Sequence, residues 1–279
     1  MRSTLFSIFG LQIRSYGLMM AVGFALGIWR AARISGKRYG IDPERVYDLA
    51  LVVLVSGVLG ARVVYILLNP ATEHWRDFVA VWQGGLSFHG GLGFAMLAGY
   101  VYTRIAKLGY WTCGDLLAPS IAIGYAFTRI GCFLNGCCYG CPTSLPWGVR
   151  FPSEHGFVTP PSHPTQIYAF AANLLIFWLL TRIERRRRKP GSIPPGMIPG
   201  GIGGKPGFVF VSYLGLYSIY RFAIEFLRSG CSAKLWAFGL TQAQGVSIAV
   251  IVLSAVLMLT VYRPQAAGQG KDKNAGKGR

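Results

Sequence analysis

Seven long apolar stretches, separated by more polar segments, constrain the fold of this chain more than any other feature. A helix needs about 20 mostly apolar residues to cross roughly 30 Å of hydrocarbon, and each stretch meets or approaches that length. The sequence therefore predicts an all-α polytopic membrane protein with about seven transmembrane helices. The predicted spans are 16–34, 46–68, 90–106, 116–133, 166–181, 208–227 and 240–262. Polar groups interrupt the third, fifth and sixth, where a buried or re-entrant segment is the alternative.

Composition and charge support a membrane protein. Of the 279 residues, 52% are hydrophobic and only 14% are charged, whereas soluble domains carry about 25% charged residues. These values exclude an ordinary soluble enzyme and a disordered chain. The net charge of +18 would also suit a nucleic-acid-binding protein, but here the basic residues lie between apolar runs. No nucleic-acid partner is therefore expected.

The distribution of Lys and Arg predicts the orientation in the membrane, because cytoplasmic loops carry the excess of these residues. Most of them fall in alternate connecting segments, at 30–45, 104–107, 182–205 and 263–279. We expect the N-terminus outside and the C-terminus in the cytoplasm. The predicted organisation is a single transmembrane domain at 1–262, with an outer-face loop at 132–165, a basic cytoplasmic loop at 182–206 and a disordered basic cytoplasmic tail at 263–279.

Three arginines, Arg62, Arg129 and Arg221, lie inside or at the ends of apolar stretches. A charge at bilayer depth is costly, so it is expected to face a protein cavity and to mark function. Three cations with few carboxylates nearby indicate an anionic ligand. A phospholipid phosphate fits that description.

The segment 213–228 carries a polar stripe. Its residues Tyr213, Tyr217, Arg221 and Glu225 are spaced by four and share one helix face. Glu225 would orient the Arg221 guanidinium for bidentate contact with a phosphate. The structural alternative is a neutralised ion pair that lets the helix enter the membrane.

A glycine-rich segment at 82–93 leads into the third span and contains His89. Four of its glycines, at 84, 85, 90 and 91, flank His89 and allow a non-helical backbone to approach a headgroup closely. The sequence therefore predicts a re-entrant or interfacial segment here. His89 is the side chain in this segment suited to proton transfer near neutral pH, and a structural histidine is the alternative.

The segment 128–142 combines Arg129 and Asn135 with glycines 131, 136 and 140, which permit a tight loop with backbone N–H groups open to an anion. It also holds Cys132, Cys137, Cys138 and Cys141. Their spacing is not the paired C-x-x-C of zinc sites, so neither a metal nor a cofactor is predicted. A disulfide ranks first for these cysteines, free thiols second and a metal third.

Several motifs, taken together, resemble the prolipoprotein diacylglyceryl transferases and occur in that family's order. They are Ser15-Tyr-Gly-Leu-Met19, Gly60-Ala-Arg62, Gly85-Leu-Ser-Phe-His-Gly-Gly91, Arg129-Ile-Gly131 with Asn135-Gly136 and Gly140, His163-Pro-Thr-Gln-Ile-Tyr168, and Tyr220-Arg-Phe-Ala-Ile-Glu-Phe-Leu-Arg228. The resemblance covers the chain from about residue 10 to 262.

The resemblance implies an enzyme of the bacterial cytoplasmic (inner) membrane that performs the first step of lipoprotein maturation. It would transfer the diacylglyceryl group of phosphatidylglycerol to the lipobox cysteine of a preprolipoprotein signal peptide, forming a thioether and releasing glycerol phosphate. Its partners would be these two substrates and membrane lipids. The family's pattern implies catalytic roles for His89, Tyr217, Arg221 and Glu225, and substrate-binding roles for Tyr16, Arg62, Arg129, Asn135, Gly136 and Gly140.

Three positions depart from the family's pattern. Cys132 stands where the pattern has Asn, and Cys137 and Ala169 stand where it has Glu. These exchanges leave open a related polytopic lipid-binding protein without transferase activity. An anion transporter is the other alternative, since it would also use arginines within the membrane and broken helices.

Overall fold

The computed structural model of the chain describes residues 4–8, 11–70, 78, 85–152, 158–187, 205–228 and 239–262. The predicted tail at 263–279, most of the predicted basic loop at 182–206 and the start of the glycine-rich segment at 82–84 lie outside the described residues.

Each of the seven predicted spans corresponds to a helix in the described part of the chain. The helices are α1 (Ser15–Ile34), α2 (Pro43–Leu68), α3 (Phe88–Ile105), α4 (Tyr110–Asn135), α5 (Thr165–Arg187), α6 (Phe208–Arg228) and α7 (Gln242–Thr260), and the π-helical segment η1 (Ser35–Tyr39) follows α1. Among the described residues, five helices are long and apolar enough to cross a membrane: α1 with η1, α2, α4, α5 and α7. The chain is thus a multi-pass membrane protein, while glycines and His89 in α3, and tyrosines and charges in α6, dilute the apolar character of those two helices.

The prediction of an all-α chain is wrong at the N-terminus. An antiparallel hairpin of β1 (Thr4–Ile8) and β2 (Leu11–Arg14) precedes α1. The sequence of β2, Leu-Gln-Ile-Arg, alternates apolar and polar residues, which is the period of a strand. The pattern is much shorter than a membrane span, so long apolar runs did not reveal it.

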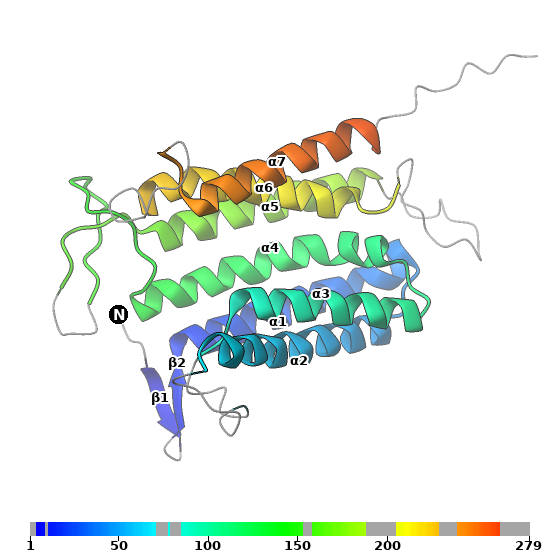
Figure 1. Cartoon of the computed structure of the whole chain (residues 1–279), viewed down its shortest axis with the longest axis horizontal. Helices are drawn as coiled ribbons and strands as arrows, with labels where there is room; N and C mark the ends of the chain where they lie inside the picture. The colour runs from blue at the N-terminus through cyan, green and yellow to red at the C-terminus, as the bar shows by residue number, and fades with distance from the viewer. Residues whose placement is uncertain are drawn as a thin grey trace, which may run out of the picture.

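Helix α4 lies in the middle of the helical bundle, with α1, α2 and α3 on one side and α5, α6 and α7 on the other (Figure 1). Successive helices alternate in direction. The starts of α1, α3, α5 and α7 therefore lie at the same end of the molecule as the last residues of α2, α4 and α6 (Figure 1). We call this end the site end, because most of the predicted site residues lie on these helix termini.

Glycines bring α1 and α4 into close backbone contact. A Cβ atom at Gly23 would lie 2.6 Å from the Gly124 carbonyl oxygen, and one at Gly27 would lie 3.0 Å from the Ser120 carbonyl oxygen. Small residues at such contacts allow membrane helices to pack tightly without a hydrophobic driving force between them. The α1–α4 contact thereby fixes the start of α1 against the end of α4.

A buried ion pair connects α1 and α5 at the end of the bundle opposite the site end. Arg30 on α1 pairs with Glu184 on α5, whose side chain is 1% exposed. The Tyr39 hydroxyl donates to the other Glu184 oxygen at 2.6 Å, and Arg38 lies 3.8 Å from the carboxylate. This cluster was not predicted, because no local sequence pattern relates α1 to α5.

Candidate active site

The predicted pair of Arg221 and Glu225 is present near the end of α6, and a third residue completes it. Arg221 is hydrogen-bonded and ion-paired to one carboxylate oxygen of Glu225, whose side chain is 5% exposed. Thr241 donates its hydroxyl to the other oxygen at 3.1 Å. The carboxylate is thus held from two elements, and it fixes the position of a guanidinium whose side chain remains 24% exposed.

Thr241 also begins α7, because its side chain accepts the Gln244 N–H while Gln244 accepts the Thr241 N–H. This reciprocal arrangement is a capping box. The same hydroxyl therefore places the start of α7 and holds the Glu225 carboxylate. The sequence analysis missed Thr241, although the pattern Thr-x-x-Gln before an apolar run was a signal that could have found it.

Arg129 lies on α4 within a group of tyrosines. Its guanidinium donates to the Tyr125 hydroxyl and sits 4.7 Å from the centre of the Tyr125 ring. The Tyr217 hydroxyl on α6 donates to the same Tyr125 hydroxyl at 3.4 Å, and the two rings meet edge to face. Tyr125 thereby connects two predicted site residues, Arg129 and Tyr217. The sequence analysis missed Tyr125, which its position one helical turn before Arg129 could have indicated.

No carboxylate of the described residues neutralises the charge of Arg129. Within the described ranges Arg129 makes no salt bridge, and its Nε atom is buried without a hydrogen-bond partner. Buried donors in native structures are nearly always satisfied, so an unused one indicates a group that the protein alone does not supply. An anion with several oxygens, such as a phosphate, would satisfy it.

Tyr16 lies beside this group in the first turn of α1. Gly131 allows the approach, since a Cβ there would lie 3.1 Å from the Tyr16 Cα. The Tyr16 hydroxyl is within electrostatic range of Arg129, and its side chain is partly exposed. The structure thus brings Tyr16, Arg129 and Tyr217 into one region at the site end, next to Arg221.

Two of the predicted glycines have clear backbone roles. Gly136 ends α4 in the left-handed conformation, with φ of 75°. Gly140 packs against the last turn of α6, where a Cβ would lie 2.3 Å from the Leu227 carbonyl oxygen, and it donates its N–H to the His163 carbonyl at 2.9 Å. Asn135, directly before Gly136, is the half-buried last residue of α4.

Arg62 and His89 occupy the other side of the bundle. Arg62 is 2% exposed and donates to the Gly85 carbonyl oxygen at 3.2 Å, just before α3 begins. Gly85 has φ of 69°, and a Cβ there would lie 2.5 Å from Arg62. Arg62 therefore positions the backbone that leads into α3. His89 is exposed in the first turn of α3, and in the part of the chain that the structure describes it has no hydrogen bond to the arginines.

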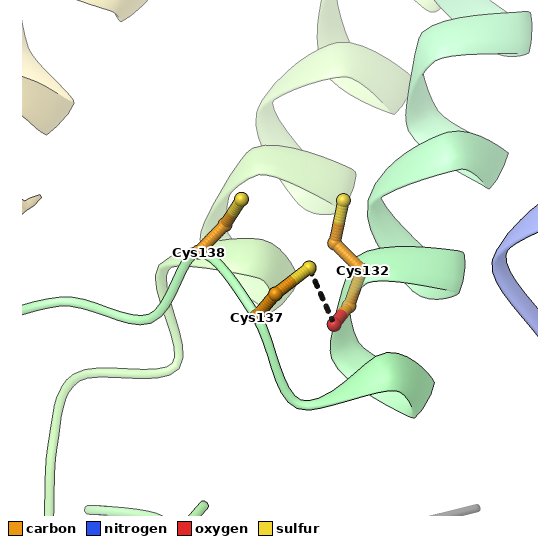
Figure 2. Close-up of side chains that lie close together, drawn as sticks. All are labelled: Cys132, Cys137 and Cys138. Carbon is orange, nitrogen blue, oxygen red and sulfur yellow. Dashed lines mark hydrogen bonds between the residues drawn. The ribbon is translucent and has the colours of Figure 1, made fainter. Parts of the chain in front are cut away.

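The prediction of a disulfide among the loop cysteines is wrong for three of the four. Cys132, Cys137 and Cys138 are free thiols, whereas Cys141 is disulfide-bonded. The three free thiols lie together where α4 gives way to the loop (Figure 2). The neighbouring thiols of Cys132 and Cys137, with the positive charges of Arg228 and Arg129, lower the pKa of Cys138 against the opposing effect of burial.

Comparison with known proteins agrees with these observations. The model of a family described as prolipoprotein diacylglyceryl transferase matches residues 3–260. A phosphatidylglycerol–prolipoprotein diacylglyceryl transferase of Geobacter sulfurreducens is 32% identical over 259 residues, which cover 91% of this chain and 92% of that protein. Proteins of the same name from Thermosynechococcus vestitus and Nitratidesulfovibrio vulgaris (strain Miyazaki F) are 32% and 35% identical, over 90% and 95% of this chain and 90% and 94% of theirs.

The helices define an integral membrane protein with a cationic site, made by Arg129 and Arg221, at one end of its bundle. The length of the match and the shared motifs identify the family within this class. The chain belongs to the prolipoprotein diacylglyceryl transferase family.

Proposed function

We propose that this protein transfers the diacylglyceryl group of phosphatidylglycerol to the lipobox cysteine of a preprolipoprotein signal peptide. The observation that carries the proposal is Arg129, a cation without a carboxylate partner among the described residues and with a buried donor still unused. The names of its relatives, all phosphatidylglycerol–prolipoprotein diacylglyceryl transferases, support the same substrates.

In the proposed reaction, the substrate thiol loses its proton and the thiolate attacks the glyceryl carbon that bears the phosphate. The carbon–oxygen bond breaks, its electron pair stays on the phosphate oxygen, and glycerol phosphate leaves as a thioether forms. Arg129 and Arg221 stabilise the charge that grows on the leaving phosphate, because charge-assisted hydrogen bonds strengthen as that charge develops. Glu225, which accepts the Thr241 hydroxyl, positions Arg221, and Tyr125, which accepts the Tyr217 hydroxyl, positions Arg129.

His89 has one of two roles in this proposal: base for the substrate thiol, or ligand of the headgroup. Its exposed position at the start of α3 suits contact with an incoming substrate. The variant His89→Gln separates the two roles. A base would lose kcat together with its pH dependence, whereas a headgroup ligand would mainly raise KM for phosphatidylglycerol.

The proposal includes the placement in the membrane. We propose seven spans, with α3 and α6 completing the five that meet the length and hydropathy criteria, in the bacterial inner membrane. The N-terminus and the site end would lie outside and the C-terminus in the cytoplasm, since Lys and Arg concentrate in the loops at the opposite end. Asn135, Gly136 and Gly140 would then shape the outer rim of the lipid site beside Tyr16, while Arg62 positions α3 from within.

The test is a transfer assay with purified protein in detergent, phosphatidylglycerol and a lipobox peptide carrying either Cys or Ser. We expect a diacylglyceryl mass shift on the Cys peptide alone. Arg221→Ala should lower the rate about 100-fold or more, the loss typical of removing a transition-state donor. Arg33→Ala serves as the control, because this exposed arginine lies at the opposite end and stacks on Trp29.

Two results would contradict the proposal. One is a normal transfer rate in Arg221→Ala, which would show that Arg221 does not stabilise the leaving phosphate. The other is no transfer by the wild-type protein when a relative is active alongside, which would favour a lipid-binding or transport function.

A further inference from the structure

The three free thiols at the end of α4 form a compact group that the proposed transfer reaction does not use. Cys132 lies in the last turn of α4, and Cys137 and Cys138 follow the helix end at Gly136. Their sulfur atoms all lie within 4.8 Å of one another. Figure 2 shows the three side chains side by side, with the Cys137 thiol also directed to the Cys132 carbonyl oxygen at 3.7 Å.

An unusual backbone conformation produces this convergence. Adjacent residues of an extended chain point to opposite sides, so neighbouring cysteines do not normally present their thiols together. Cys138 has φ of 66°, a left-handed conformation that is uncommon outside glycine. Such residues persist where the surrounding structure fixes them, and they concentrate at functional sites. Here the left-handed turn places the Cys138 thiol next to the thiols of Cys132 and Cys137.

The start of α5 holds the loop in this conformation. The Gln166 side-chain amide donates to the Cys137 carbonyl at 2.8 Å, and the Thr165 hydroxyl donates to the Cys138 carbonyl at 2.8 Å. Gln166 is completely buried, and its Oε1 atom has no hydrogen-bond partner among the described residues. The thiols are therefore preorganised by side chains of another helix, which lowers the entropic cost of binding a ligand between them.

We propose that Cys132, Cys137 and Cys138 bind one zinc ion through three thiolates. A Zn–S bond is about 2.3 Å long, so tetrahedral coordination sets the sulfurs about 3.8 Å apart. The observed group, within 4.8 Å, needs each pair of sulfurs to close by about 1 Å or less to reach that geometry. Thiolates favour zinc over magnesium or calcium, which take oxygen ligands.

The charges around the group suit a divalent ion. Three thiolates with Zn(II) carry a net charge of −1, and the positive charges of Arg228 and Arg129 act on Cys138. A monovalent ion would leave −2 in a partly buried place. No other His, Cys, Asp or Glu of the described residues joins the group, which leaves the fourth tetrahedral position to water. In this loop, cysteines stand where the family pattern has the polar residues Asn and Glu. A zinc-bound water would supply a polar group in their place.

The first test measures the metal content of the whole protein, purified in detergent with reductant and without chelator, by mass spectrometry of the elements. We expect one zinc per chain in the wild type and in Cys113→Ser, a buried free cysteine of α4 outside the group. Cys138→Ser and Cys132→Asn should both lose the zinc. Cys132→Asn introduces the residue that the family's pattern has at this position, so we expect this variant to fold. Loss of zinc in it would therefore not be a result of misfolding.

The second test replaces zinc by cobalt in the wild type and in Cys113→Ser. A tetrahedral thiolate site should give intense thiolate-to-cobalt charge-transfer absorption, which Cys132→Asn should lack. Two results would overturn the proposal: wild-type protein that binds neither ion, or thiols of the group that react with a maleimide reagent only after reduction, which would indicate a disulfide. Neither readout depends on transfer activity, so failure of this site and failure of the proposed function are distinguishable.

Discussion

The hydroxyl of Thr241 has two partners, the Glu225 carboxylate and the Gln244 N–H, and substitutions can separate them. Thr241→Val removes the hydroxyl at nearly constant volume. A hydrogen bond to a charged group contributes about 1.5–3 kcal/mol, so we expect kcat/KM to fall about 10- to 100-fold as Arg221 loses its fixed position. The transfer assay checks this result.

Loss of the helix cap must be distinguished from loss of the contact with Glu225. Gln244→Ala removes half of the capping box but leaves the hydroxyl, so it should lower the thermal midpoint while transfer at permissive temperature stays near wild type. Thr260→Val, on the exposed far end of α7, should change neither. A wild-type rate in Thr241→Val would refute the positioning role.

Tyr125 touches Arg129 both through its hydroxyl and through its ring face. Tyr125→Phe keeps the ring and removes the hydroxyl that also receives the Tyr217 hydrogen bond. We expect kcat/KM for phosphatidylglycerol to fall about tenfold, the effect of about 1.4 kcal/mol. Tyr110→Phe, at the opposite end of α4, is the matched control. Equal kinetics in the two variants would show that the Tyr125 hydroxyl does not position Arg129.

At the scale of elements, the sequence predicted the helices well and their contacts poorly. Length and hydropathy located all seven helices, and the spacing of four placed Arg221 and Glu225 together, because both signals are local. The contacts of Thr241 with Glu225 and of Tyr217 with Tyr125 join different helices, which periodicity cannot relate. The convergence of the cysteines depends on the left-handed backbone conformation of Cys138, which cannot be predicted from the presence of a cysteine.

The start of α6 depends on such a contact between elements. Asp115 on α4 is buried, and its carboxylate accepts the Gly207 N–H and the Phe210 N–H, each at 2.9 Å. It thereby caps α6 from another helix, where a negative charge also favours the helix dipole. We expect Asp115→Asn to destabilise the protein by about 1–2 kcal/mol, seen as a lower thermal midpoint in detergent.

The exposed helix cap of α2 serves as the control for the Asp115→Asn prediction. Asp42 accepts the Glu44 N–H at the start of α2 and is open to solvent. Asp42→Asn should lower the midpoint less than Asp115→Asn, since Asn is also a good capping residue and water can satisfy the exposed donors. Equal effects at the two positions would show that the contact between α4 and α6 adds no stability.

At the scale of the whole molecule, the candidate active site lies at one end of the bundle and a stabilising ion-pair network lies at the other. The site end carries Arg129, which has a buried donor without a partner among the described residues, whereas the opposite end carries a buried, paired network around Glu184. Alternating helix direction produces this separation, since each helix contributes one terminus to each end (Figure 1). A change in the Glu184 network should therefore alter stability without altering the chemistry at the site end.

Glu184→Gln tests this separation. It leaves Arg30, whose side chain is 12% exposed, without its charge partner, and breaking a buried pair costs about 3–5 kcal/mol. We expect a much lower thermal midpoint but near wild-type transfer at permissive temperature, and the exposed control Glu44→Gln should change the stability by less than about 0.5 kcal/mol. The double variant Arg30→Met/Glu184→Leu should recover most of the stability, because replacing both charges with apolar groups removes the desolvation cost. If Glu184→Gln instead lost transfer while keeping its midpoint, the two ends would be coupled, and the network would belong to the active site.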